Sequence, residues 1–270
     1  MTETLHSPPP ARPAFDPNEL RMTRLRALRG PNFWRLAPVI ACDIRLGALE
    51  HVTSSDIPGF AQRLVEAMPS LHEHPCTRGT AGGFVERLNE GTHFPHILEH
   101  VAIELQTLTG SDVSFGRVVE SGDPGVWWVI VAYEEEEVGL QSMRDAVHIV
   151  RSVMVGDTPD LDRMVVDLQD LYESVRLGPS TGAIVEEARR RGIPVRRLNN
   201  SSLVQLGLGK NLRRIQATMT DFTSAIGVEI AQDKDDTKRV LQNIGLPVPR
   251  GDVATTIEGA IEIAEEIGFP

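Results

Sequence analysis

The chain has 270 residues, of which 41% are hydrophobic and 5% aromatic, which suits one large core or two modest ones. Its formal net charge of −11 repels a phosphate backbone and argues against a nucleic-acid partner. No apolar run is long enough to cross a bilayer and no secretory signal is present, so we predict a cytoplasmic protein without a membrane partner. The two cysteines, Cys42 and Cys76, form no C-x-x-C pair and are predicted to be reduced thiols.

Residues 1–21 include three consecutive prolines and lack an apolar period, which predicts a disordered tail. The stretch 36–46 is rich in apolar and β-branched residues and predicts a strand. Two similar runs, 112–121 and 125–134, flank a Gly-Asp-Pro-Gly turn and predict an antiparallel hairpin. The four glutamates 134–137 are predicted to mark a solvated strand end.

Helical periods occupy much of the remaining chain. Apolar residues recur at three- and four-residue steps in the stretches 55–71, 82–91, 95–108, 139–156, 160–175 and 180–192. The clearest is 95–108, where Pro95 fits the first turn and Gly110 ends the helix. Short strand-like pieces and glycines follow, then two helical patterns at 233–245 and 256–268. Together these patterns predict an α+β N-terminal domain, with a hairpin-containing sheet and packed helices, and then an incomplete α/β segment.

The predicted helix 95–108 carries an H-x-x-E-H motif, formed by His96, Glu99 and His100, in an otherwise apolar run. Residues three and four apart share one face of a helix, so both imidazoles can reach one point with the carboxylate beside them. Inverted zinc peptidases use this arrangement, in which the histidines bind Zn²⁺ and the glutamate is the general base. The spacing leaves open an alternative, a polar helix edge with solvated histidines.

A catalytic zinc site needs a third protein ligand. We expect Glu187 in this role, because its separation from the motif is similar to that in inverted zinc peptidases. Glu104, Glu173 and Glu186 are the other carboxylates considered, although four-residue steps carry Glu104 around the helix and away from the shared point. Each carboxylate, taken singly, also fits an ordinary solvated helix surface.

Two further motifs carry chemically active side chains. The segment HEHPC places His72, His74 and Cys76 at alternating positions that could face one metal, but an exposed loop is the favoured interpretation. Lys234 and Lys238 lie at helical spacing and could meet the phosphate oxygens of ATP. An exposed, charged helix start capped by an aspartate is the more economical interpretation of that segment.

Six segments occur in a fixed order: LRALRGPNFW, GGFVERLNEGTHFPHILEHVAIELQ, LGPSTGAIVEEA, LVQLG, RIQAT, and DKDDTK with GLPVPRG. They resemble the N-terminal portion of the cyanophycin synthetase family, from about residue 24 to the end of the chain. The resemblance implies a tail over 1–21, the family's N-terminal domain over 22–190, and a truncated start of the ATP-grasp domain over 191–270.

That family is an ATP-dependent amide ligase that builds multi-L-arginyl-poly-L-aspartate from aspartate and arginine, with ATP and Mg²⁺. The resemblance implies that the N-terminal domain holds this polymer and, in some members, cleaves it into primers at a zinc site matching His96, Glu99 and His100. It also implies cyanophycin and the remainder of the synthetase as partners, a homo-oligomer, and no polymer synthesis by this chain alone. A non-catalytic module that tethers cyanophycin is the alternative, and a C-terminal nucleotide site is a weaker one.

Overall fold

The first sheet has the strand order β1-β2-β4-β3, and each neighbouring pair is antiparallel. The computed structural model describes residues 16–268. The strands are β1 (Arg21–Leu28), β2 (Val39–Arg45), β3 (Gly116–Glu120) and β4 (Val126–Ala132). The strand predicted at 36–46 is β2, and the predicted hairpin is β3 and β4 with the Gly-Asp-Pro-Gly turn between them, so both predictions are confirmed.

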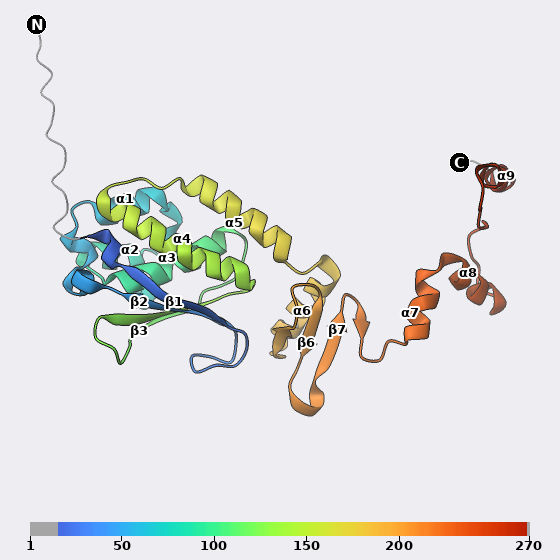
Figure 1. Ribbon diagram of the computed structural model, residues 1–270, viewed down its shortest axis with the longest axis horizontal. Helices are drawn as coiled ribbons and strands as arrows, with labels where there is room; N and C mark the ends of the chain where they lie inside the picture. Colours follow the sequence, from blue (N-terminus) through green and yellow to red (C-terminus); the bar gives the residue numbers. More distant parts are fainter. Residues whose placement is uncertain (1–15, 269–270) are drawn as a thin grey trace, which may run out of the picture.

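Five helices cover one face of this sheet and leave its other face without a helical layer (Figure 1). They are α1 (Phe60–Ala67), α2 (Gly83–Glu90), α3 (Phe94–Leu108), α4 (Glu136–Val155) and α5 (Leu161–Val175). The connecting segments of this part contain five short 3-10 helices: η1 (Pro17–Glu19), η2 (Gly47–His51), η3 (Ser54–Asp56), η4 (Pro69–Glu73) and η5 (Cys76–Arg78). The main core lies between the helices and the sheet. Alternation along β2 shows this, because Ile40, Cys42 and Ile44 face the main core while Val39 and Ala41 face a smaller aromatic cluster on the opposite side.

Helix α3 is buried on nearly every side, because it packs between α4 and the strands β3 and β4. Pro95 lies in its first turn, as predicted, and the chain turns at Gly110, whose φ of 96° favours glycine. A helix surrounded in this way is usually apolar on every side, whereas α3 also buries His100, Glu104 and Gln106. The polar side chains of α3 are therefore held inside the domain, which makes their partners decisive for the site.

Folded structure begins earlier than predicted. The predicted tail 1–21 mostly lies outside the described residues, but Leu20 is fully buried in the main core. The carbonyl of Leu20 accepts hydrogen bonds from the guanidinium of Arg151 in α4. One buried apolar side chain and one backbone acceptor thus anchor the segment that precedes β1. A single apolar residue produces no periodic pattern in the sequence, so the prediction missed this anchor.

The four glutamates 134–137 do not form a solvated strand end, and that prediction is wrong. Glu136 and Glu137 begin α4, where carboxylates are stabilised by the helix dipole. Glu134 and Glu135 lie between β4 and α4 and pair with arginines of the C-terminal part, as described below. Burial raises the pKa of Glu135, and Arg197 and Arg189 oppose that rise.

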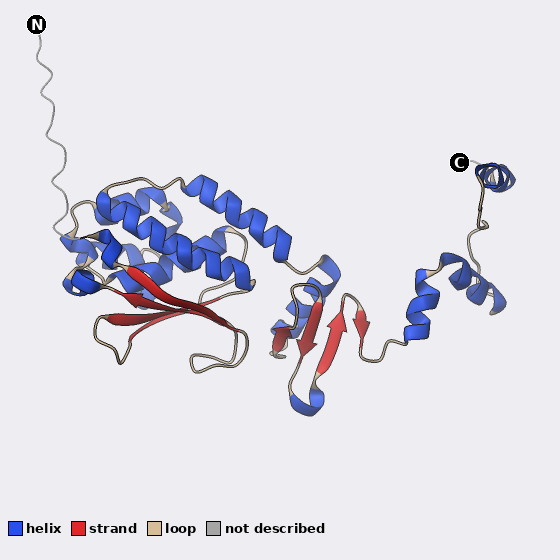
Figure 2. Ribbon diagram, viewed as in Figure 1, coloured by secondary structure: helices blue, strands red, loops and turns tan. Residues whose placement is uncertain are grey.

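The C-terminal part begins with α6 (Pro179–Arg190), which packs on a second four-stranded sheet (Figure 2). Its strands are β5 (Val195–Arg197), β6 (Leu203–Leu206), β7 (Arg213–Gln216) and β8 (Met219–Thr220), with η6 (Gly209–Asn211) between β6 and β7. All pairs are antiparallel, unlike the strands of an α/β unit, because the connections are too short for the crossovers that parallel strands require. The whole described chain is α+β.

The last helices, α7 (Ala225–Gln232), α8 (Lys234–Asn243) and α9 (Ile257–Ile267), contain no buried residue among those described. They extend away from the second sheet in Figure 1. Apolar side chains such as Ile226 and Ile257 are more than two-thirds exposed there. Within residues 16–268, no helix combines the length and the apolar character needed to span a membrane.

Candidate metal centre

Helix α3 presents His96, Glu99 and His100 on one side, as the motif predicted. The rings of His96 and His100 lie 4.7 Å apart at an angle of 85°. His100 is only 8% exposed, and the ring of Phe84 from α2 stacks on it at 4.0 Å. The stacked ring fixes the plane of the His100 imidazole, so its orientation is set by packing as well as by the helix.

Cys76 joins the two histidines. One potential ligand atom from each of Cys76, His96 and His100 lies within 4.8 Å of the others. The Sγ atom of Cys76 is 3.3 Å from Nε2 of His96. The preferred interpretation of HEHPC as an exposed loop is therefore wrong for Cys76 and for His74, which are both partly buried, while His72 is exposed.

Helix α2 holds this segment against α3. The N–H of Gly82 donates to the carbonyl of His72, and the N–H of Phe84 donates to the carbonyl of His74 at 3.2 Å. A Cβ atom on Gly83 would lie 2.2 Å from the carbonyl oxygen of Pro75, so only glycine permits this approach. Cys76 itself has a φ of 48°, an uncommon conformation for a residue with a side chain. The close packing and the strained backbone together place the thiol beside the histidines.

The donor set Cys/His/His fits zinc. Structural and catalytic zinc sites use thiolate and imidazole ligands, and catalytic sites keep three protein ligands with one open position. In a tetrahedral site the ligand atoms are separated by about 3.4 Å for two nitrogens and about 3.6 Å for nitrogen and sulfur. The 3.3 Å distance between Cys76 and His96, and the 4.8 Å limit on all three atoms, are within small side-chain movements of these values.

The protonation of the imidazoles also suits metal binding. Burial, with a smaller contribution from Arg87, lowers the pKa of His96 to about 4. Burial and then the neighbouring histidines lower the pKa of His100 to about 2. Both rings are therefore neutral at pH 7, as a metal ligand must be. Nδ1 of His96 lies 3.0 Å from the hydroxyl of Thr92, which leaves Nε2 as the nitrogen directed at Cys76.

Glu99 lies in the same cleft with a carboxylate suited to proton transfer. Burial raises its pKa to about 7, and the positive charge of Arg87 only partly opposes this rise. General bases work best when their pKa is close to the working pH. Glu99 contacts strand β3 at Gly116, whose missing side chain leaves the space that the carboxylate occupies.

The cleft that contains these groups has a volume of about 800 Å³. Besides the metal-binding candidates, it is lined by Arg87, Arg117, Glu73 and the ring of Trp127. Arg87 donates to the hydroxyl of Thr77 at 3.1 Å. The cleft thus offers both signs of charge to a substrate.

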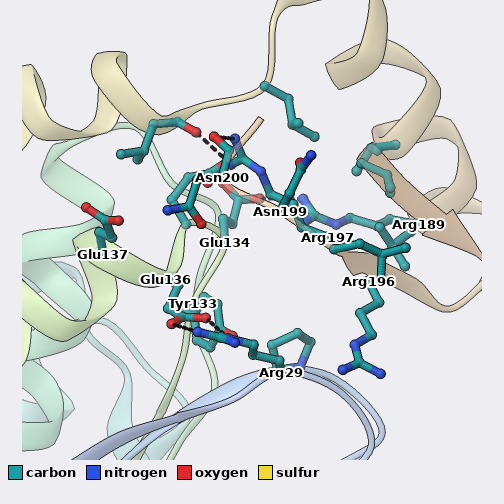
Figure 3. Close-up of a pocket in the computed structure, with 18 residues that line it drawn as sticks. Arg29, Tyr133, Glu134, Glu136, Glu137, Arg189, Arg196, Arg197, Asn199 and Asn200 are labelled. Atoms are coloured by element: carbon teal, nitrogen blue, oxygen red, sulfur yellow. Dashed lines mark hydrogen bonds and ion pairs between the residues drawn. The ribbon is translucent and has the colours of Figure 1, made fainter. Parts of the chain in front are cut away.

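A second, smaller cavity of about 160 Å³ lies between the first sheet and the C-terminal part (Figure 3). Ion pairs cross or border it: Arg29 with Glu136 at 2.5 Å, Arg197 with Glu135 at 2.6 Å, and Arg189 with Glu134 at 3.5 Å. Arg197 also donates to the carbonyl of Val175, at the end of α5. Because most of these charges already pair with one another, the cavity is a junction between the two parts, and the chemistry is concentrated in the cleft at α3.

The structure does not bring Glu187 to the histidines. Glu187 lies on α6, outside the residues that line the cleft, and Arg190 and Arg191 each donate to it at 2.6 Å. These hydrogen bonds lower the pKa of Glu187 to about 2. Glu173 is likewise paired on its own helix, with Arg176 at 2.9 Å. Cys76, and not the predicted Glu187, is the third potential metal ligand beside His96 and His100.

The two lysines of the C-terminal part lie on α8. Asp233 caps this helix, because its carboxylate accepts from the backbone N–H groups of Asp235 and Asp236. Lys234 is exposed, and Lys238 donates to the carbonyl of Gly251. The capped and charged helix start matches the more economical interpretation of this segment, and a contact with phosphate stays a prediction.

Comparisons with known proteins identify relatives over most of this chain. Residues 41–155 match the family model of the cyanophycin synthase-like N-terminal domain. The chain is 46% identical over 254 residues to a cyanophycin synthetase of Trichormus variabilis, and 42% identical over 260 residues to one of Synechocystis sp.. These alignments cover 92% and 93% of this chain but 28% and 29% of the relatives, so the chain spans less than a third of their length. The resemblance predicted from the ordered motifs is confirmed.

Proposed function

We propose, on the premise that this chain belongs to the cyanophycin synthetase family through its N-terminal domain, that its cleft is a zinc endopeptidase site that cleaves cyanophycin into primers. One observation carries the proposal: Cys76, His96 and His100 converge within 4.8 Å while Glu99 lines the same cleft. Three neutral or thiolate donors with an adjacent carboxylate form the minimal set for metal-assisted amide hydrolysis.

Each residue has a defined task in this scheme. Zinc, when bound, lowers the pKa of a coordinated water and polarises the scissile carbonyl. Cys76, His96 and His100 hold the metal, and Glu99 takes a proton from the attacking water and delivers it to the leaving amine. A pKa of about 7 allows the Glu99 carboxylate both to accept and to release that proton near neutral pH.

The charges of the cleft match the proposed polymer. Cyanophycin carries a guanidinium and a free carboxylate on every repeat. Arg87 and Arg117 offer positive partners for the carboxylate, and Glu73 offers a carboxylate for the guanidinium. Recognition of both groups at once would distinguish this polymer from an ordinary acidic or basic peptide.

The test is incubation of the purified chain with stoichiometric zinc and cyanophycin. We expect one zinc per chain and progressive shortening of the polymer. Glu99→Gln should retain the zinc but lower the cleavage rate by about 10²–10⁴, the usual contribution of a general base. Glu66→Gln is the matched control, because Glu66 is an exposed residue of α1 that bonds only to Gln62 of its own helix among the described residues. Intact polymer after prolonged incubation of the zinc-loaded chain would reject the peptidase and leave a tethering module.

We further infer that residues 191–270 belong to an ATP-dependent amide ligase, since the relatives are cyanophycin synthetases. In that ligase Lys234 and Lys238 would face the phosphates of ATP bound with Mg²⁺. In this chain both lysines lie on a helix without buried residues, so we expect no thermal stabilisation by ATP. A clear upward shift in melting temperature with ATP and Mg²⁺ would contradict this expectation.

A further inference from the structure

A chain of hydrogen bonds connects His100 to two further residues that line the same cleft. Nδ1 of His74 lies 2.8 Å from Nδ1 of His100. Nε2 of the same His74 ring lies 2.5 Å from Oε2 of Glu104. The side chains of His74 and Glu104 are 13% and 5% exposed, so water competes little with either bond. Glu104 is one turn beyond His100 on α3, and His74 bridges the two positions.

The carboxylate of Glu104 sets the direction of the hydrogen bonds along this chain. An ionised carboxylate only accepts hydrogen bonds, so Nε2 of His74 carries a proton and donates to Glu104. Burial alone would raise the pKa of Glu104, but hydrogen bonds from His74 and Ser70 outweigh it and lower the pKa, which keeps the carboxylate ionised. When the single ring proton of His74 is on Nε2, its Nδ1 has a lone pair that accepts a hydrogen bond from Nδ1–H of His100.

The consequence falls on the other nitrogen of His100. With its proton on Nδ1, a neutral His100 ring has a bare lone pair on Nε2. His96 shows the same pattern, because its Nδ1 is engaged by Thr92 and its Nε2 is directed at Cys76. Both histidines of the motif therefore have Nδ1 occupied by a protein partner and Nε2 free for a metal.

We propose that Glu104 and His74 form a positioning relay, Glu104 to His74 to His100, that fixes the His100 ring in the tautomer and orientation in which Nε2 binds the metal. The proposal rests on the function proposed above only in taking the centre to be a metal site. His74 acts through His100 and is not itself a ligand, because both of its nitrogens are engaged. Hydrogen-bond partners of this kind orient metal-ligating histidines and increase their basicity.

The test measures zinc affinity by competition with a chelator of known strength, at fixed pH. We expect His74→Ala and Glu104→Ala to weaken zinc binding by about 10–100-fold, the usual loss when such a partner is removed. Glu104→Gln should lose less, because the amide oxygen still accepts from Nε2 of His74. His72→Ala is the matched control: His72 is two residues from His74 in the same segment, is exposed, and has no side-chain hydrogen bond among the described residues. The control should bind zinc as the wild type does.

Cobalt(II) substitution and NMR provide readouts independent of cleavage. In every relay variant the thiolate-to-cobalt absorption from Cys76 should persist, because the ligands remain. Long-range ¹H–¹⁵N spectra of the metal-free protein should show His100 protonated at Nδ1 in the wild type and a mixture of tautomers in Glu104→Ala, which removes the acceptor for Nε2 of His74. That second variant keeps the test valid if His74→Ala does not fold.

The outcomes separate the relay from the peptidase. Unchanged zinc affinity in Glu104→Ala and Glu104→Gln, or a wild-type His100 protonated at Nε2, would overturn the relay while cleavage could still occur. Complete loss of metal in His74→Ala would make His74 a ligand and would also overturn it. Graded loss of affinity in a chain that binds zinc without cutting the polymer would support the relay and reject the peptidase. A wild-type chain that binds no zinc would overturn both.

Discussion

A single methyl group added to strand β3 should disable Glu99 without disturbing the metal ligands. A Cβ atom on Gly116 would lie 2.3 Å from Oε1 of Glu99, 2.5 Å from its Cγ and 2.7 Å from its Cδ. Gly116 does not have a positive φ, so alanine imposes no backbone strain there. The whole perturbation of Gly116→Ala therefore falls on the Glu99 side chain, which must move away from the strand.

The size of that movement sets the expected loss. Ordinary carbon–oxygen contacts begin near 3.3 Å, so Oε1 has to move by about 1 Å from its 2.3 Å position. A displacement of about 1 Å at a catalytic group costs on the order of 10²-fold in rate. This corresponds to about 2.7 kcal/mol of activation free energy. Zinc affinity should stay within about twofold, because the carboxylate is not a ligand.

The assay is the initial rate of cyanophycin cleavage at saturating polymer, with zinc content measured on the same sample. Gly122→Ala in the turn of the same hairpin is the matched control, because a Cβ there meets nothing within 4 Å. Both substitutions reduce the conformational entropy of the unfolded chain in the same way. A Gly116→Ala protein that cleaves as fast as Gly122→Ala would refute the assignment of Glu99 as the base.

Two further predictions concern the metal-free protein. Cys76 should react with a thiol reagent in the folded chain and be protected by stoichiometric zinc. Cys42 should react only after unfolding, because it is buried and burial raises its pKa to about 12. Equal labelling of both thiols in the folded chain would contradict this. Folding should weaken in acid, because His96 and His100 have pKa values lowered by burial and the unfolded chain binds more protons below pH 6.5. The raised pKa of Glu99 acts in the opposite direction, because in this pH range the folded chain keeps a proton on Glu99 that the unfolded chain loses. Two histidines against one glutamate leave a net change in the free energy of unfolding of about 1.4 kcal/mol per pH unit between pH 4.5 and 6.5. Urea unfolding at pH 5.0 and 6.5 measures the difference, and equal stability at the two pH values would count against neutral buried imidazoles.

Local patterns were sufficient for the elements that frame the site. The helix at 95–108 and the β3–β4 hairpin depend on periodicity, a proline in the first turn and a Gly-Asp-Pro-Gly turn, all encoded within a few residues. The placement of His96, Glu99 and His100 on one side of α3 followed from helix geometry alone. These features need no knowledge of what packs against the helix.

The third position of the site depends on contacts between distant segments. Glu187 was preferred on chain separation, which says nothing about where α6 packs, and the structure places it with the second sheet. Cys76 reaches the histidines because Gly83 allows α2 to approach Pro75, a steric detail that a sequence pattern does not reveal. The alternation of HEHPC was a usable signal, since His74 and Cys76 both enter the site. The glutamates 134 and 135 were misjudged for a similar reason, because their arginine partners lie about 55 to 62 residues away.

Glu99 differs from His96, His100 and Glu104 on the same buried helix α3, because those three side chains have hydrogen-bond partners. A buried polar group without a hydrogen bond costs free energy, so a buried helix retains such groups only where partners exist. His96 has Thr92, and His100 and Glu104 share His74. Glu99 has no hydrogen-bond partner among residues 16–268, and its pKa is raised to about 7 as a result of burial. The carboxylate that the fold leaves without a partner lines the cleft, where a substrate or an attacking water would supply one.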